Sequence, residues 1–197
     1  MNSLSNGDSA NSPNGQPSKL GTGYFALVIY VPDPLGRFLD DLRRDLVPHD
    51  NPRAHVSVLP PRSLAVEWQI ASGELRALSE MWRPFDIELT RIDVFPVTDV
   101  IYLELAWEGA GELHQMHAAA SRCLAFNEPF RYHPHVTLAQ EIVPDRVTEM
   151  RERAERQWHE YRGPRRFHAE RAIFVQSAPG NCWVDLAEYP LGVPVAR

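Results

Sequence analysis

The alternation of apolar and polar residues predicts a chain in which short strands and amphipathic helices follow one another. Residues 24–31 form an apolar run of the length that is typical of a buried strand. Asp33 and Pro34 then predict a helix start, with Asp33 as the N-cap and Pro34 at the first helical position. This helix would bury one apolar stripe, made of Leu35, Phe38, Leu39, Leu42 and Leu46.

The same order of predicted elements then occurs twice. The strand at 24–31 and its helix are followed by a strand at about 54–59 that Pro60 and Pro61 end, a helix at about 66–82, and a strand at 85–95 with a bulge near Arg91. The second set is a strand at 100–107, a helix at about 111–125, a strand at about 134–139, a helix opened by Pro144, and strands near 167–176 and 182–187. We therefore expect two matching halves, 24–95 and 100–187. In the strand at 100–107, alternate residues should share one face, namely Ile101, Leu103, Leu105 and Trp107.

Two of the predicted strands carry the same polar pattern. HVSV begins at His55, and HVTL begins at His135. Because successive side chains of a strand point to opposite faces, each histidine shares a face with the hydroxyl residue two positions later, Ser57 or Thr137. If the two halves face each other, two imidazoles and two hydroxyls converge on one cleft. Such a set can transfer protons on both sides of a phosphate and hold its oxygens.

Composition limits where such a protein can act. The chain has 197 residues, of which 44% are apolar, enough for the core of one domain or of two small lobes. A formal net charge of −6 gives no overall basic character, so any contact with RNA must be local, and we expect no DNA partner. Cys123 and Cys182 are expected to be reduced core residues of a cytoplasmic protein, although only geometry can exclude a disulfide.

The polarity of the chain also bounds its domain. No apolar run approaches the length that a membrane span needs. Residues 1–20 are rich in Ser, Asn, Gly and Pro, which predicts a disordered tail, so that 21–197 form the folded domain. We expect this domain to be a monomer.

The two motifs, and the order of elements around them, resemble the 2H phosphoesterase superfamily and in particular its LigT-like branch, also called 2′-5′ RNA ligase-like. The likeness covers residues 24–187. It implies an α+β, bilobal and pseudo-duplicated fold, in which two antiparallel sheets flank a central cleft and the helices lie outside. It also implies phosphodiesterase chemistry without a metal or other cofactor, on a 2′,3′-cyclic phosphate or a 2′-5′ linkage in a nucleotide or an RNA end.

The resemblance also implies roles for the motif residues. His55 and His135 would be the catalytic pair, with His55 as the acid and His135 as the base. Ser57 and Thr137 would bind phosphate. The remaining candidates for substrate binding are Arg62, Tyr132 and Gln140.

Two positions depart from the pattern of the RNA-directed members. They often have an aromatic residue just after the first motif, where this chain has Leu59-Pro60-Pro61. They also often have arginine after the Leu-Ala of the second motif, where this chain has Gln140. We take Arg62 as the candidate for the missing cation. Tyr132, just before the second motif, is either a core residue or a platform for base stacking.

The other histidines and a charged run have simpler interpretations. His114 and His117 lie three residues apart on a predicted helix and are expected on its surface rather than at a metal. His133 is expected at the entrance of the second histidine strand, where it can line the cleft. The run 146–166 alternates basic and acidic residues, which favours a solvated helix face. An alternative is a basic rim for a phosphate backbone, made of Arg162, Arg165 and Arg166.

A second function of a different class stays open on the sequence. The cleft would bind a nucleotide or a phosphorylated metabolite without turning it over, which the replacements at Pro60 and Gln140 motivate. Two complete histidine–hydroxyl motifs favour the enzyme, because a binding protein needs no pair of proton-transfer groups.

Overall fold

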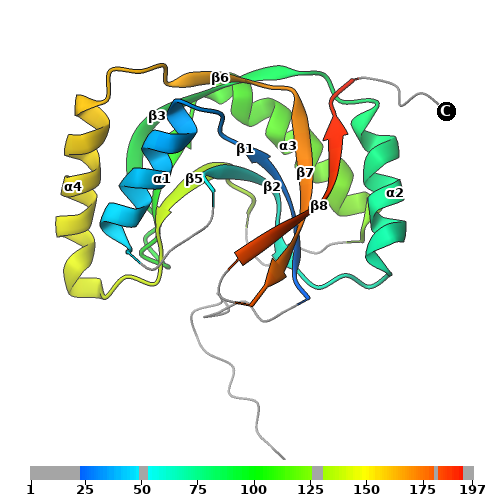
Figure 1. Ribbon diagram of the computed structural model, residues 1–197, viewed down its shortest axis with the longest axis horizontal. Coiled ribbons are helices and arrows are strands. Elements are labelled where there is room, and N and C mark those ends of the chain that lie inside the picture. The colour runs from blue at the N-terminus through cyan, green and yellow to red at the C-terminus, as the bar shows by residue number, and fades with distance from the viewer. Residues whose placement is uncertain (1–22, 49–52, 126–130, 180–181, 193–197) are drawn as a thin grey trace, which may run out of the picture.

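The protein is described by a computed structural model at residues 23–48, 53–125, 131–179 and 182–192. Within these residues, one curled antiparallel sheet of eight strands is flanked by four α-helices (Figure 1). Its elements are β1 (Phe25–Tyr30), α1 (Leu35–Leu46), β2 (His55–Arg62), α2 (Trp68–Ser79), β3 (Phe85–Val94), β4 (Ile101–Leu105), α3 (Trp107–Cys123), β5 (His135–Ala139), the 3₁₀ turn η1 (Pro144–Arg146), α4 (Val147–Glu160), β6 (Arg166–Ala169), β7 (Arg171–Ala178) and β8 (Cys182–Pro190). The strand order is β6-β3-β4-β5-β2-β1-β7-β8.

The prediction of two separate sheets is wrong. β2 and β5, the two strands that carry the histidine motifs, are hydrogen-bonded neighbours in the middle of the single sheet. Their antiparallel pairing at Val56 and Val136 joins the strands of the two predicted halves edge to edge, so these strands do not face each other across a gap. The mixed α and β composition of the fold is confirmed, whereas the duplication of the halves stays a prediction.

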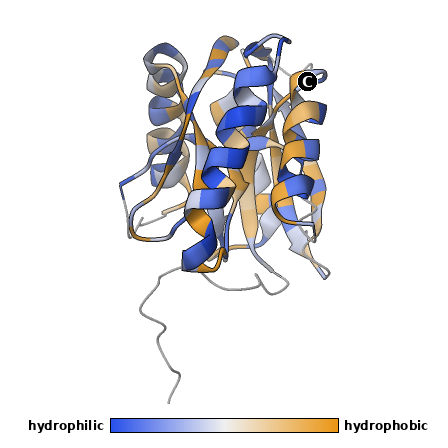
Figure 2. Ribbon diagram, turned by 90° about the vertical axis from the view of Figure 1, so that its left-hand side faces the viewer, coloured by the Kyte–Doolittle hydropathy of each residue, from blue (hydrophilic) through white to orange (hydrophobic). Residues whose placement is uncertain are grey.

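The helices cover one face of the sheet in two pairs. α1 packs against α4, and α2 packs against α3, as their positions at the left and right of Figure 1 show. The predicted stripe of α1 is confirmed, because its four leucines are buried and Phe38 packs partly buried against the same core. The outward side of the α4 region is hydrophilic (Figure 2). The main core therefore lies between the helices and one face of the sheet, which leaves the opposite face to carry the site.

The start of α1 differs slightly from the prediction. The helix begins at Leu35, with Pro34 at the N-cap position. The Asp33 carboxylate nevertheless accepts a hydrogen bond from the backbone N–H of Arg37 at 3.1 Å, and an ion pair joins the two side chains at 2.8 Å. Asp33 thus still satisfies one of the free donors of the first turn.

The prediction that Pro60 and Pro61 end their strand is wrong. β2 continues to Arg62, and its register with β1 shifts between Ser57 and Leu59. β5 begins only at His135, so the later part of β2 has no β5 partner to which the prolines would have to donate. Proline is tolerated where a strand has such an open side.

Of three further predictions, one is confirmed and two are wrong. The bulge near Arg91 is confirmed by a register shift between Leu89 and Ile92. Trp107 is not part of the preceding strand: it begins α3 and is 80% exposed. The strand predicted near 167–176 is two strands, β6 and β7.

The predicted tail at 1–20 lies outside the described residues. In the part of the chain that is described, no helix is long and apolar enough to cross a membrane.

Candidate active site

The structure brings the two histidine motifs together by direct strand pairing. The valine at the second position of each motif pairs with its counterpart, and both valines are completely buried in the core. One step away in either direction, the antiparallel register sets His55 opposite Thr137 and Ser57 opposite His135. Side chains directly opposite each other in such a pair have Cβ atoms about 4.5–5.5 Å apart. The four polar residues thus form a square on the face away from the core.

Aromatic rings border this square on both sides. On the β1 side, Tyr30 pairs with His55, and their rings meet edge to face at 6.4 Å. On the β4 side, Tyr102 pairs with Thr137 and stacks on Phe95 at 4.1 Å. The ring of His135 meets this stack edge to face, 4.9 Å from Phe95 and 5.4 Å from Tyr102. Each imidazole is therefore packed edge to face against neighbouring aromatic rings.

Both imidazoles are oriented by a hydrogen bond to the backbone carbonyl two residues earlier. Nδ1 of His55 lies 2.6 Å from the carbonyl oxygen of Arg53, and Nδ1 of His135 lies 2.7 Å from that of His133. A carbonyl only accepts a hydrogen bond, so Nδ1 is the protonated nitrogen in each ring. Nε2 is then left to accept or donate a proton at the substrate.

The surroundings of His135 favour its neutral form. Its pKa is lowered to about 4, mainly by burial and in addition by the nearby His133 imidazole, while the hydrogen bond to the His133 carbonyl acts in the opposite direction. At neutral pH His135 is therefore uncharged, with a lone pair on Nε2. This is the state that a general base needs.

Tyr132 lies behind the square rather than in it. Its hydroxyl donates to the carbonyl of Ser57 at 2.7 Å, and its ring stacks on His117 of α3 at 3.8 Å with an interplanar angle of 2°. Nδ1 of His117 hydrogen-bonds the next carbonyl, that of Val58, at 2.8 Å. These two side chains hydrogen-bond two successive carbonyls of β2 near the point where β5 begins. This contact gives Tyr132 a supporting position beneath the site, and its predicted contact with substrate stays a prediction.

The prediction that His117 lies on the surface is wrong. The residue is 8% exposed and packs toward β2. The signal that could have shown this is the helical spacing of the buried stripe of α3, made of Leu113, Met116, His117 and Ala120. His114 is half-buried and contacts the edge of the Tyr132 ring at 5.2 Å.

Arg62 and Gln140 lie farther along their strands than the square. Arg62 is five residues beyond Ser57, roughly 16 Å at the rise of an extended strand, and its Nε donates to the carbonyl of Pro60 at 3.1 Å. Gln140 directly follows the last residue of β5, three residues beyond Thr137, or roughly 10 Å. The structure therefore does not bring either residue next to the imidazoles.

Three residues that the sequence did not single out lie beside His55. The Tyr30 hydroxyl donates to the Asp185 carboxylate at 2.6 Å, and the Arg53 guanidinium lies 3.8 Å from the centre of the Tyr30 ring. One nitrogen of Arg53 is 3.7 Å from the second carboxylate oxygen of Asp185. Arg53 stands two positions before His55, so strand alternation could have placed it on the same face.

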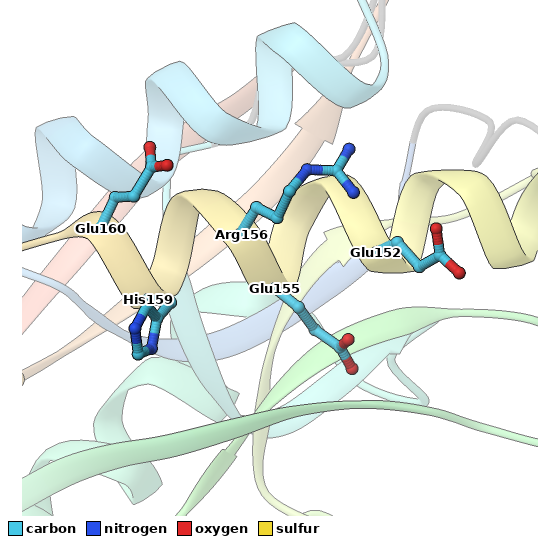
Figure 3. Close-up of a pocket in the computed structure, with 5 residues that line it drawn as sticks. All are labelled: Glu152, Glu155, Arg156, His159 and Glu160. Carbon is cyan, nitrogen blue, oxygen red and sulfur yellow. The ribbon is translucent and has the colours of Figure 1, made fainter.

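The charged run after Pro144 forms a solvated face of α4. A depression on α4 is lined by side chains that all project from that one helix (Figure 3): Glu152, Glu155, Arg156, His159 and Glu160. An ion pair at i,i+4 joins Arg151 to Glu155 at 2.8 Å, as expected of a solvated helix face.

Two arginines of the alternative basic rim have partners elsewhere. Arg165 donates to the carbonyl of Trp158 at 2.5 Å, and Arg166 pairs with Asp86 at 2.5 Å. Arg166 begins β6, the edge strand on the far side of β3 and β4 from the histidine strands. Within the described ranges, no group of three or more His, Cys, Asp or Glu side chains is arranged to hold a metal ion.

Comparisons of whole structures show the same fold in other proteins. Escherichia coli LigT complexed with phosphate superposes with a TM-score of 0.59 at 15% identity, covering 86% of this chain and 98% of that one. Usb1 of Kluyveromyces marxianus gives 0.57 at 15% identity, covering 86% and 99% of the two chains. TT0787 of Thermus thermophilus gives 0.57 at 14% identity, covering 86% and 98%.

The comparison with curated protein sequences finds no match to this chain. The model of the 2′-5′ RNA ligase superfamily, in contrast, matches residues 31–181, which include both histidine strands. The resemblance to the 2H phosphoesterases is thereby confirmed. The chain belongs to the 2′-5′ RNA ligase superfamily.

Proposed function

We propose that this protein is a phosphodiesterase that opens a 2′,3′-cyclic phosphate, or cleaves a 2′-5′ linkage, by acid–base catalysis with two histidines. The observation that carries the proposal is the square of His55, Ser57, His135 and Thr137, in which both Nδ1 atoms face backbone carbonyls. This arrangement supports a mechanism in which the Nε2 atoms of both imidazoles act on the same phosphate.

The steps follow from this arrangement. Neutral His135 takes a proton from a water molecule through Nε2 as the water oxygen forms a bond to phosphorus. The bond from phosphorus to a ribose oxygen breaks, and protonated His55 gives its Nε2 proton to that oxygen. The hydroxyls of Ser57 and Thr137 donate to the non-bridging oxygens, where negative charge increases in the transition state.

The assignment of His135 as the base has two supports. The resemblance to the family implies it, and the burial that lowers the pKa of His135 keeps its lone pair available at neutral pH. The two histidines would exchange roles in the reverse, ligating direction.

The ligands of the similar structures fit this substrate class. LigT has been crystallised with phosphate and with 3′-AMP. We propose that this chain likewise takes a nucleotide or an RNA end that carries the reacting phosphate. Gln140, which stands where many relatives have arginine, is the observation that favours the alternative of binding without turnover.

An assay for hydrolysis separates the two functions. Wild-type protein and the His55→Ala and His135→Ala variants are incubated with nucleoside 2′,3′-cyclic phosphates and 2′-5′ dinucleotides, and the products are separated by chromatography. We expect turnover by the wild type and a loss of about 10²–10⁴-fold in each variant, the range for a general acid or base. The matched control is His159→Ala on α4, whose side chain lies on the solvated helix face.

Unchanged circular dichroism spectra would show that the variants fold. Near-wild-type turnover by a folded His55 or His135 variant would exclude the two-histidine mechanism. Tight binding of the same nucleotides with no turnover of any of them would establish the alternative.

A further inference from the structure

The reacting phosphate of the proposed mechanism would gain from a cation beside the square, and the expected positions lie farther along their strands. Arg62 lies at the far end of β2, and the position after the second motif is Gln140. The two hydroxyls are neutral, and the protons of the two imidazoles are used at the water and the leaving oxygen, so no residue of the square keeps a permanent positive charge for the non-bridging oxygens. The structure offers another candidate on the β1 side of His55.

Arg53 is held next to the reacting square by an aromatic ring. Its guanidinium lies 3.8 Å from the centre of the Tyr30 ring, and the same ring meets the edge of His55 at 6.4 Å. A guanidinium above an aromatic ring is attracted to the π face of the ring, and its N–H groups can still donate hydrogen bonds in the plane of the guanidinium. The Arg53 backbone also supplies the carbonyl at Nδ1 of His55. The backbone of Arg53 is therefore coupled to the orientation of the imidazole.

The ring that supports Arg53 is itself fixed. The Tyr30 hydroxyl donates to Asp185 at 2.6 Å. Burial, together with the hydrogen bond and charge of that carboxylate, raises the pKa of Tyr30 above its ordinary value, so the hydroxyl remains a donor. Asp185 comes from β8 and Tyr30 from β1, so two strands hold the platform.

Arg53 is less completely neutralised than other arginines of the sheet. Its nearest carboxylate contact, to Asp185, is 3.7 Å long, with side-chain exposures of 64% and 49%. Arg91 of β3 instead contacts Glu104 at 2.7 Å, and Arg171 of β7 contacts Glu188 at 2.8 Å. A contact as long as 3.7 Å between exposed groups contributes little, so an incoming phosphate can replace it.

We propose that Arg53 is the phosphate-binding cation of this site, set above Tyr30 and restrained by Asp185. The proposal rests on the proposed function for the identity of the ligand, because it takes the square as the place of the reacting phosphate. The guanidinium donates to a non-bridging oxygen of the reacting phosphate, while His55 protonates the ribose oxygen that leaves. Asp185 orients Arg53 through Tyr30 but also competes with the phosphate for its charge.

This arrangement predicts opposite effects for two neighbouring substitutions. Arg53→Met removes the charge and the donors, so the affinity for phosphate falls about tenfold or more. Asp185→Asn keeps an acceptor for Tyr30 but removes the competing charge, so the affinity rises about two- to fivefold. Arg53→Lys, with a charge but no planar fork, is expected to lie between wild type and Arg53→Met.

Calorimetric titration with inorganic phosphate at constant ionic strength tests the proposal without requiring turnover. The matched control is Arg146→Met in η1, just before α4, where an exposed arginine pairs with Glu149 at 3.0 Å. We expect this control to bind phosphate like the wild type. Melting curves of every variant verify that the proteins fold.

The titration and the hydrolysis assay can fail separately. Equal phosphate affinity of wild type and Arg53→Met, or no binding by the wild type, would overturn the role of Arg53. Weaker binding by Asp185→Asn would do the same, because it would mean that the cluster is only structural. Phosphate affinity that depends on Arg53, in a protein that hydrolyses none of the panel, would retain the cation and reject the proposed reaction.

Discussion

Protonation of His135 should make this protein less stable in mild acid. Its pKa is lowered to about 4 in the folded protein, mainly by burial, and an unfolded histidine has its ordinary value near 6.5. Between these two values the unfolded state binds a proton that the folded state does not. The free energy of unfolding therefore decreases as the pH falls from about 6.5 to about 4.

The size of this effect follows from the two pKa values. Each unit of difference corresponds to about 1.4 kcal/mol, so His135 alone would lower the free energy of unfolding by about 3 kcal/mol over that window. Above pH 6.5 both states are neutral at this position, and the full stability is present. The same proton would produce the acid limb of kcat/KM, which should fall near pH 4 rather than near 6.5.

Urea unfolding at pH values from 4 to 8, for wild type and His135→Gln, measures the effect directly. Glutamine does not titrate, so the difference between the two curves isolates His135 from other groups such as Asp86, whose pKa is lowered by His168 and Arg166. We expect the variant to lose about 3 kcal/mol less than the wild type between pH 6.5 and 4. Parallel curves for the two proteins would refute the burial argument and leave His135 with an ordinary pKa.

Two other predictions concern the support of the site and its chemistry. Tyr132→Phe removes the hydrogen bond to the Ser57 carbonyl, which should lower the free energy of unfolding in a urea titration by about 0.5–1.5 kcal/mol and raise KM by displacing Ser57. If both values are unchanged, the contact is dispensable. Activity should survive EDTA, because the two imidazoles and two hydroxyls carry every proposed step without a metal ion; loss of turnover that zinc or manganese restores would contradict the acid–base mechanism.

The sequence by itself determined which residues share a face. Strand alternation depends on neighbours one or two positions away, so the pairing of His55 with Ser57 and of His135 with Thr137 on the faces of β2 and β5 follows from the local pattern. The same is true of the leucine stripe of α1 and the bulge in β3, which are both confirmed. Local patterns sufficed because local geometry sets the direction of each side chain.

Only the tertiary structure decided how these faces meet. His55 and His135 are 80 residues apart in the sequence, and no local pattern states that their strands are hydrogen-bonded neighbours in one sheet rather than parts of two. Register between distant strands depends on the packing of whole elements, which a short segment does not encode.

The same reason explains the residues that sequence patterns missed or misplaced. Arg53 rests on a ring from β1 that a carboxylate from β8 holds, and Tyr132 reaches a carbonyl 75 residues earlier in the chain. Each of these contacts joins segments that only the folded sheet brings together. The reactive residues of the motifs can be recognised in short sequence segments. The residues that orient and support them cannot, because the order of strands in the sheet determines which distant side chains become neighbours.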